Sequence, residues 1–460
     1  MQVESIIIGG GIAGAYIANI FNEDKKDFIL LEASYKLGGR HLSIKDKKEN
    51  VLYEAGAWRV HSSHKRMLKL CKKLNLTLEF FEGQHKRDEN LQGTKGLSKI
   101  DEIILANKGD LMKSFKEELE TGYQGTYDAS ASTNPYSVNT KEGEYYTIKE
   151  GQEEIINRLV EDIDKDRIYL NHRVQDIKRE KNNYHLTVLY RNQKGDIKEK
   201  LIKCKYLFSC VAQFDAWSWT IVQQNLYPLL NAVKPLPLMH IYVKGQPPKD
   251  IKKLRKIPNN ALQQIIPATH NQDWYQISYS AGRVAMFWYN YKLKYGERKM
   301  KELLEEYSGL KFERVSSYFW SHAYHLWLTT PYFNLEKAVK NSIMPNPIIL
   351  PNFWWAGECF SSYQGWSEGA LETAELVLAD FYEKKIGYSP IYKTIPKNIN
   401  EWMLFDNRIL DVKRWKNVHP GSKEAIINHL GEDISKLFRY IKHSELSWAA
   451  LYSIQIGYLK

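Results

Sequence analysis

Three glycines near the start of the chain, Gly9, Gly11 and Gly14, follow an apolar run at the spacing G-x-G-x-x-G. Residues 6–8 predict a buried strand, and a helix is expected to begin near Gly11. Glycine at such a strand-to-helix turn lets the backbone approach a pyrophosphate, whose charge then faces the free N–H groups of the helix. The pattern therefore predicts a nucleotide-binding βαβ unit.

The second strand of this unit is expected at residues 28–31, and Glu32 stands at its end. A carboxylate there can accept hydrogen bonds from the ribose hydroxyls of an adenosine, and it disfavours a 2′-phosphate. Because strand, glycines, helix and acid occur in this order, the motif is more specific than a set of glycines alone.

The composition is that of a globular protein. The 460 residues are 43% hydrophobic and 13% aromatic, which allows about two to three domains with sizeable cores. The four cysteines show no metal-binding spacing, so a reducing compartment is expected and no disulfide is assumed. A net charge of +11 from scattered lysines indicates a solvated surface and no nucleic-acid groove. Without a recognisable signal peptide or an apolar run of about 20 residues, the expectation is a cytoplasmic protein with no integral membrane association.

Beyond the first unit, helices are expected at residues 65–74 and 150–160, separated by a polar, lysine-rich stretch at 84–139. Strands are expected at residues 168–170, 174–177, 184–190 and 206–211. The aromatic runs 274–279 and 284–289 are interpreted as further strands, and the charged segment 299–307 as a helix.

Two further motifs make the nucleotide site more specific. Gly39 and Arg40 follow the ribose acid, and a distant segment contains Glu358 and then the run 365–374. With these pieces in order, residues 1–383 resemble the flavin-dependent amine oxidase superfamily. The resemblance implies FAD, with Arg40 along the pyrophosphate and ribityl chain, Glu358 at the ribityl hydroxyls and the backbone of Val174 at the adenine. The cysteine that binds flavin covalently in monoamine oxidases has no counterpart between Cys210 and Cys359, so the FAD is expected to be noncovalent.

The implied fold combines α/β and α+β parts. A Rossmann-like FAD-binding domain, residues 1–58, 145–232 and 345–384, is interleaved with an α+β substrate domain, residues 59–144 and 233–344. The residues expected to contact FAD are Gly9, Gly11, Ile12, Ala13, Gly14, Glu32, Ala33, Gly39, Arg40, Ala57, Trp58, Arg59, Val174, Gly357, Glu358, Gly365, Trp366 and Ser367.

Within the superfamily, the segment 54–59 followed by His64 is more similar to the L-amino acid oxidases. This resemblance implies that Arg59 clamps the carboxylate of the substrate, as a guanidinium can do bidentately. It also implies that Tyr279 supports the same carboxylate and that Trp366 walls the site and excludes water. A surface arginine, a half-buried strand tyrosine and a core tryptophan are the alternative interpretations of these residues.

His240 stands where many members of the superfamily have a lysine that is associated with the oxygen reaction or with hydrolysis. The departure argues against efficient use of dioxygen. His240 is either a further catalytic residue that accepts a proton near neutral pH or a satisfied strand histidine.

Residues 386–460 resemble cytochrome b5, a small α+β domain. Two short strands are expected around a turn at 406–407, followed by helices at 423–430, 433–440 and 446–452. The matching motifs contain His419 and His443, which lie 24 positions apart. The resemblance implies that both ligate the iron of haem b, an arrangement that suits electron transfer, and two surface histidines are the alternative. Ser422 departs from the pattern of the family, which has a glycine there.

The fusion predicts a flavin-dependent L-amino acid oxidase or dehydrogenase that forms a 2-oxo acid and ammonia and passes electrons to the haem. An amine or polyamine oxidase is one other interpretation. A flavin module that receives electrons from the haem and desaturates or modifies a larger acceptor is another. The expected partners are a small-molecule amino acid or amine and an electron-transfer partner, and the oligomeric state is left open.

Overall fold

The computed structural model describes residues 1–81, 144–192, 194–246, 261–262, 265–266, 270–271, 273–330, 332–383 and 389–460. The polar stretch noted at 84–139 lies outside the described residues. The predicted glycine-motif strand is β1 (Ser5–Ile8), the middle strand of a five-stranded parallel sheet. The order across this sheet is β16 (Phe353–Trp355), β12 (Tyr206–Ser209), β1, β2 (Phe28–Leu31) and β8 (Ile168–Tyr169).

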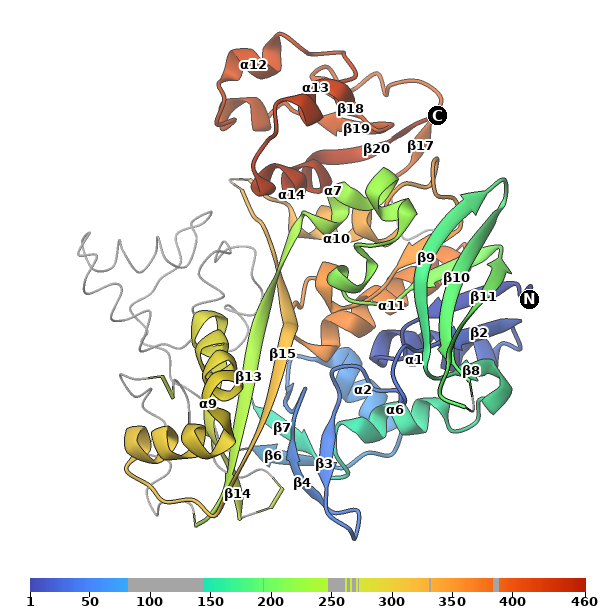
Figure 1. Ribbon diagram of the computed structural model, residues 1–460. Coiled ribbons are helices and arrows are strands. Elements are labelled where there is room, and N and C mark those ends of the chain that lie inside the picture. Colours follow the sequence, from blue (N-terminus) through green and yellow to red (C-terminus); the bar gives the residue numbers. More distant parts are fainter. Residues whose placement is uncertain are drawn as a thin grey trace, which may run out of the picture.

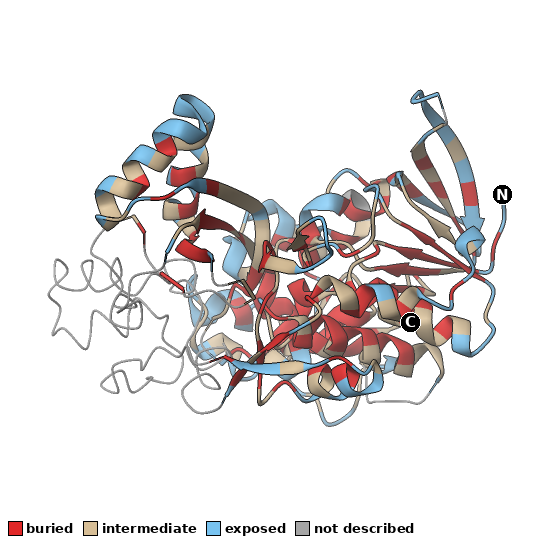
Figure 2. Cartoon of the chain, turned by 90° about the horizontal axis from the view of Figure 1, so that it is seen from below, coloured by how far each residue is buried: buried red, intermediate tan, exposed pale blue. Residues whose placement is uncertain are grey.

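Apolar side chains bury both faces of this sheet, as its continuously apolar strands require. Ile7 faces a cluster built with the helices α1 (Ile12–Glu23), α2 (Lys65–Lys73), α6 (Glu153–Val160) and α11 (Ser367–Phe381). Ile6 and Ile8 face the opposite cluster, to which an antiparallel sheet of β9 (His172–Glu180), β10 (Asn183–Arg191) and β11 (Ile197–Cys204) contributes. Figure 1 shows these layers, and in Figure 2 the buried residues gather in the inner strands and on the inward faces of the helices. The predicted α/β class is confirmed.

A further antiparallel sheet extends away from the parallel sheet (Figure 1). Its long strands β13 (Val233–Lys244) and β15 (Arg314–Trp327) pair with each other, and β14 (Trp274–Ala281) pairs with the other edge of β13. The helical segment α9 (Gly282–Ser308), kinked at Gly296, packs on this sheet and includes the predicted helix 299–307.

The strand predicted at residues 284–289 is wrong, because these residues lie inside α9. Ala285 and Trp288, three positions apart, are buried against the sheet, whereas Met286 and Phe287 between them are exposed. That is the spacing of one helix face, which an uninterrupted run of apolar and aromatic residues conceals.

Shorter elements lie between these parts along the chain. β3 (Ser43–Lys45) pairs with β4 (Val51–Glu54), and β7 (Tyr145–Ile148) pairs with both β5 (Val60–His61) and β6 (Leu78–Phe81). The connecting helical segments are Lys165–Arg167, Gln213–Ala216, Val222–Leu226, α7 (Tyr227–Leu230), α10 (Leu335–Ile343) and Glu358–Phe360.

Residues 389–460 form an α+β unit at one end of the molecule (Figure 1). The order in its sheet is β17 (Ile391–Tyr392), β20 (Gln455–Leu459), β19 (Arg408–Asp411) and β18 (Trp402–Phe405). Its helical segments are Trp415–Asn417, α12 (Lys423–Ile427), α13 (Ser435–Tyr440) and α14 (Glu445–Ile454). Asp406 and Asn407 have φ values of 45° and 64°, the positive values that a two-residue hairpin turn requires. The predicted hairpin and three helices are confirmed.

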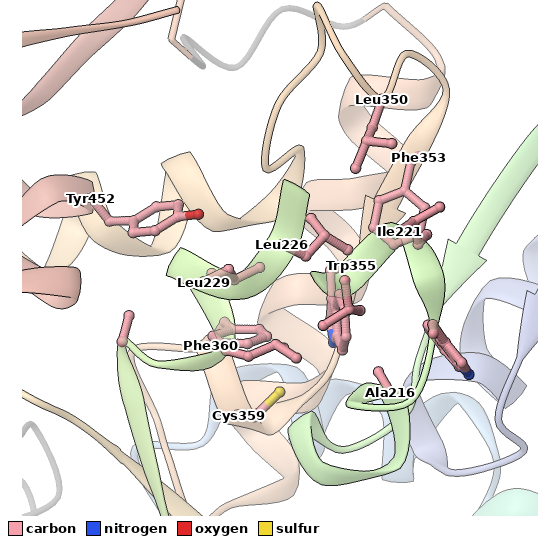
Figure 3. Packing of buried hydrophobic residues seen from close by; sticks show 14 of the residues in the cluster. Ala216, Ile221, Leu226, Leu229, Leu350, Phe353, Trp355, Cys359, Phe360 and Tyr452 are labelled. Carbon is pink, nitrogen blue, oxygen red and sulfur yellow. The ribbon is translucent and has the colours of Figure 1, made fainter. Parts of the chain in front are cut away.

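This C-terminal unit shares its hydrophobic core with the rest of the chain. α14 packs against α10 and α7, and one apolar cluster contains Phe405 and Trp448 together with Leu229 and Phe360. In Figure 3, Tyr452 lies on the C-terminal side of this cluster, beyond Leu229 and Phe360.

Candidate functional site

A cavity of ≈ 680 Å³ opens at the carboxyl ends of β1 and β2, a volume within the usual range of cofactor and ligand sites. All four predicted catalytic residues line it, namely Arg59, Tyr279, Trp366 and His240. The residues predicted to contact FAD also line it, apart from Gly14. Segments far apart in the sequence therefore meet around one space.

The glycine turn shapes the part of the cavity next to α1. Gly9 has a φ of +98°, and a Cβ there would lie 2.9 Å from the carbonyl oxygen of Cys210. Gly11 precedes the first turn of α1, and a Cβ there would have no described atom within 4 Å. The open space before the helix N-terminus fits a pyrophosphate of FAD. Gly14 has another role, because a Cβ there would lie 1.9 Å from the carbonyl oxygen of Gly9 and prevent the helix from packing on the turn.

Glu32 is fixed at the end of β2 by backbone donors. Its Oε2 accepts a hydrogen bond of 2.7 Å from the N–H of Gly10, and its Oε1 accepts one of 2.8 Å from the N–H of Ser34. The carboxylate lines the cavity and retains acceptor capacity for ribose hydroxyls.

Arg40 and Glu358 form a charged pair on the cavity wall. Nη1 of Arg40 donates to Oε2 of Glu358 and to the carbonyl oxygen of Ala323, both at 2.7 Å. The Glu358 carboxylate also accepts from Nδ1 of His325 at 2.9 Å and from the N–H of Gly365 at 2.6 Å. Burial alone would raise the pKa of Glu358, but the charges and hydrogen bonds of Arg40 and His325 outweigh it and lower this pKa to about 2. Glu358 is therefore ionised and holds the cationic side chain of Arg40 at the cavity.

The aromatic part of the cavity surrounds Arg59. Its guanidinium carbon lies 4.4 Å from the ring centroid of Trp58, 5.4 Å from that of Tyr145, 5.6 Å from that of Trp366 and 5.8 Å from that of Tyr279. Rings at these distances attract a guanidinium through their faces and restrict its orientation. The arginine that the sequence singles out is thus held in an aromatic cage at the cavity wall.

His240 lies on β13 directly opposite Tyr279 on β14, with ring centroids 5.1 Å apart. Its side chain is buried, and Nδ1 has no hydrogen-bond partner among the described residues. Burial, followed by the positive charge of Arg59, lowers the pKa of His240 to about 3. The imidazole is therefore neutral at physiological pH.

Several parts of the cavity wall were not predicted from the sequence. Residues 319–324 of β15 line it, as do His172 and Arg173 from β9 and Asp215 from the segment after β12. His325, which contacts Glu358, was also missed. None of these residues belongs to a motif, and the aromatic content of β15 is the one signal that its sequence offers.

In the C-terminal unit, the imidazole rings of His419 and His443 face each other with centroids 6.3 Å apart. Nδ1 of His419 lies 3.1 Å from the carbonyl oxygen of Ser422, and Nδ1 of His443 lies 3.0 Å from that of Phe438. Since a carbonyl oxygen only accepts, each Nδ1 donates, which leaves the Nε2 lone pairs for an iron ion. Phe438 stacks on His443 at 4.1 Å and fixes the ring. This pair fits the two axial positions of haem b.

Ser422 takes a conformation that favours glycine. Its φ is +118°, while its hydroxyl accepts a hydrogen bond from the N–H of Ala425 and caps α12. Serine in place of the family's glycine at position 422 therefore strains the backbone close to His419.

Two protein families match different parts of the chain. Residues 12–98 and 110–197 match the family of flavin containing amine oxidoreductases, and residues 393–460 match the cytochrome b5-like heme/steroid binding domain. An L-amino-acid oxidase of Mus musculus is 36% identical over 76 residues, which are 16% of this chain and 12% of that protein. Cytochrome b5 of Saccharomyces cerevisiae is 34% identical over 58 residues, 13% of this chain and 48% of that protein.

Solved structures share the fold. Cyclohexylamine oxidase from Brevibacterium oxydans has a TM-score of 0.63 at 13% identity, and the match covers 84% of this chain and 99% of that one. A putrescine oxidase variant has a TM-score of 0.59 at 11% identity, with the same coverage. In the described parts of the chain, no helix has both the length and the apolar character needed to cross a bilayer. The N-terminal part of the chain thus matches the flavin containing amine oxidoreductases and the C-terminal part matches the cytochrome b5-like domain, and these two families imply FAD and haem as cofactors.

Proposed function

We propose that the protein oxidises the C–N bond of an L-amino acid, so that the resulting imino acid hydrolyses to a 2-oxo acid and ammonia. The observation that carries this proposal is the position of Arg59, whose guanidinium lies at the cavity wall among four aromatic rings. A guanidinium binds a carboxylate with two parallel hydrogen bonds and fixes its orientation. A substrate without a carboxylate would form no such pair of hydrogen bonds with Arg59.

Bound FAD supplies the two-electron oxidation. The residues of this chain bind and orient the substrate: Arg59 holds the carboxylate, and Trp58, Trp366 and Tyr279 exclude water around it. His240 adds no second positive charge beside Arg59, because its pKa of about 3 keeps the imidazole neutral. For the same reason it does not act as the proton acceptor near neutral pH that its position in the sequence suggests.

The roles of the cofactor-site residues belong to the same proposal. We infer that the cavity residues predicted from the sequence contact FAD without a covalent bond, and that His419 and His443 ligate haem b. The domain limits inferred from the sequence, with a haem domain at residues 386–460, are part of this proposal. The facing imidazoles and the open space before α1 support it.

Arg59→Lys tests the carboxylate clamp. The apparent substrate constant for L-amino acids, measured by anaerobic bleaching of the flavin, should rise roughly 10- to 100-fold, since hydrogen bonds to charged groups contribute about 1.5–3 kcal/mol. Arg66→Lys is the matched control, because Arg66 pairs with Glu368 and Glu375 and does not line the cavity. An unchanged constant, or bleaching by simple amines and not by amino acids, would identify an amine oxidase instead.

A further inference from the structure

A continuous series of aromatic rings leads away from the haem-ligand candidate His443. Phe438 stacks on His443 at 4.1 Å, and Trp448 contacts Phe438 at 5.0 Å. Tyr227 follows Trp448 at 5.5 Å, and Trp217 follows Tyr227 at 5.8 Å. These ring centroids fall within the separations of contacting aromatic pairs, so the series has no gap.

The series crosses from the C-terminal unit to the wall of the flavin cavity. Phe438 and Trp448 belong to α13 and α14, and Tyr227 begins α7. Trp217 stands between Asp215 and Trp219, and both of these residues line the cavity. The far end of the series is therefore two residues from the cavity in either direction along the backbone.

The junction that the series crosses is fixed by hydrogen bonds as well as by apolar packing. Nδ2 of Asn341 donates to the carbonyl oxygen of Tyr452 at 2.7 Å. The guanidinium of Arg408, which is fully buried, and the hydroxyl of Tyr458 donate to the carbonyl oxygen of Pro345 at 2.7 and 2.8 Å. Moving the haem domain would break these hydrogen bonds and open the core shown in Figure 3. These contacts hold the rings on the two sides of the junction at the spacings given above.

We propose that Phe438, Trp448, Tyr227 and Trp217 form a fixed route for electrons between the flavin cavity and the haem site. The proposal rests on the proposed function only in that FAD and haem occupy these sites. Oxidation of one C–N bond releases two electrons and two protons. The protons pass to water, and each electron reduces one ferric iron to ferrous iron. A one-electron metal oxidant such as ferricyanide then reoxidises the iron once for each electron.

Tyr227 is the residue to change, because it is 44% exposed and lies on the joining surface. Flavin can be reduced without any substrate by light with EDTA as electron donor under anaerobic conditions, and the haem absorption band then reports reduction of the iron. In Tyr227→Leu this haem reduction should slow by roughly tenfold, which corresponds to about 1.4 kcal/mol of activation free energy, while flavin reduction keeps its rate. Tyr227→Phe keeps the ring and should match the unchanged protein. Tyr295→Leu removes an exposed ring on α9, outside the series, and should also have no effect.

The haem midpoint potential and haem content are measured in each variant, so that a change in the haem itself is recognised. If Tyr227→Leu lowers haem content, the rate of haem reduction in Trp217→Leu, at the other end of the series, is used as the test instead. Unchanged haem reduction in Tyr227→Leu or Trp217→Leu would overturn the proposal, as would equal slowing in Tyr227→Phe. Because the flavin is reduced by light, failure of the Arg59 clamp leaves this result unaffected.

Discussion

Arg40 and Glu358 are 318 positions apart in the sequence, yet Nη1 of Arg40 donates a hydrogen bond of 2.7 Å to Oε2 of Glu358. Glu358 is 3% exposed, and its second oxygen accepts from the backbone N–H groups of His325 and Gly365. One ionised carboxylate therefore joins the first nucleotide-binding segment, β15 and the segment before α11. These hydrogen bonds of Glu358 hold the three segments of the cavity wall together.

Glu358→Gln should destabilise the protein by about 1.5–3 kcal/mol, because it removes the charge of the carboxylate that accepts hydrogen bonds from the half-buried Arg40. The measurement is the urea midpoint together with FAD content. Glu336→Gln is the control: it breaks an exposed pair with Lys340, which is worth about 0–1 kcal/mol. Equal urea midpoints for the two variants would show that the Arg40–Glu358 pair contributes no more to stability than an exposed pair.

The same carboxylate predicts a pH dependence. Its pKa is lowered to about 2 in the folded protein from an ordinary value of 4.5, so its contribution is complete above about pH 4.5. As the pH falls from there towards 2, the unfolded state binds a proton that the folded state does not, and stability is lost. The difference in unfolding free energy between the unchanged protein and Glu358→Gln should therefore shrink over this window, and a constant difference would contradict the assigned ion pair.

Much of the site was predictable because it is encoded locally. Gly9, Gly11 and Glu32 act through the backbone turn and the strand end on which they stand, and His419 and His443 follow helical segments within one small domain. Such residues keep their positions relative to their own element, so spacing along the chain is informative.

The remainder depends on contacts between distant segments. Nothing near His325 indicates that its Nδ1 will meet Glu358, because that pairing is fixed by how β15 crosses the cavity. The run 284–289 is apolar on nearly every position, and only packing against β13 selects the helix over a strand. The shared core beneath the C-terminal unit follows in the same way from α14 meeting α7 and α10.

Substitution by alanine should affect FAD binding at Gly11 and protein stability at Gly14. Gly11→Ala places a methyl group in open space at the cavity, so stability of the apoprotein should be unchanged while FAD affinity falls roughly tenfold or more, about 1.4 kcal/mol. Gly14→Ala forces a methyl group to within 1.9 Å of the carbonyl oxygen of Gly9 and should cost about 1–3 kcal/mol of stability. Thermal unfolding of the apoprotein and FAD titration measure the two effects, and loss of stability in Gly11→Ala would refute the assignment of open space.

His240 should not titrate in the physiological range. Its pKa of about 3 means that it stays neutral between about pH 5 and pH 8, where a free histidine changes charge. The pH profile of flavin bleaching should therefore show the same apparent pKa values in the unchanged protein and in His240→Gln, even where the absolute rates differ. Disappearance of an ionisation near 6.5 in His240→Gln would show that His240 is protonated during the reaction.

Ser422→Gly should stabilise the C-terminal domain. A φ of +118° costs a non-glycine residue about 1–3 kcal/mol. Replacing the serine that caps α12 by glycine costs only about 0.3 kcal/mol. Hydrogen exchange at the amides of α12 and α13 measures the change locally, and slower exchange is expected in Ser422→Gly. Ser435→Gly is the control, because that serine begins α13 at ordinary dihedral angles and bonds the backbone of Asp406. Faster exchange in both variants would mean that the strain at 422 is negligible.

His443→Ala should abolish haem binding and leave FAD binding intact, because it removes one of two facing imidazoles whose orientation is fixed by a backbone carbonyl and by the ring of Phe438. His419→Ala should have the same effect from the opposite side. His429→Ala is the matched control in the same domain, since His429 pairs with Glu432 at the surface and faces neither ring. Iron content and the haem absorption band of each purified variant give the answer, with flavin absorbance as the internal reference. Full haem retention in either His443→Ala or His419→Ala would exclude the pair as the axial ligands.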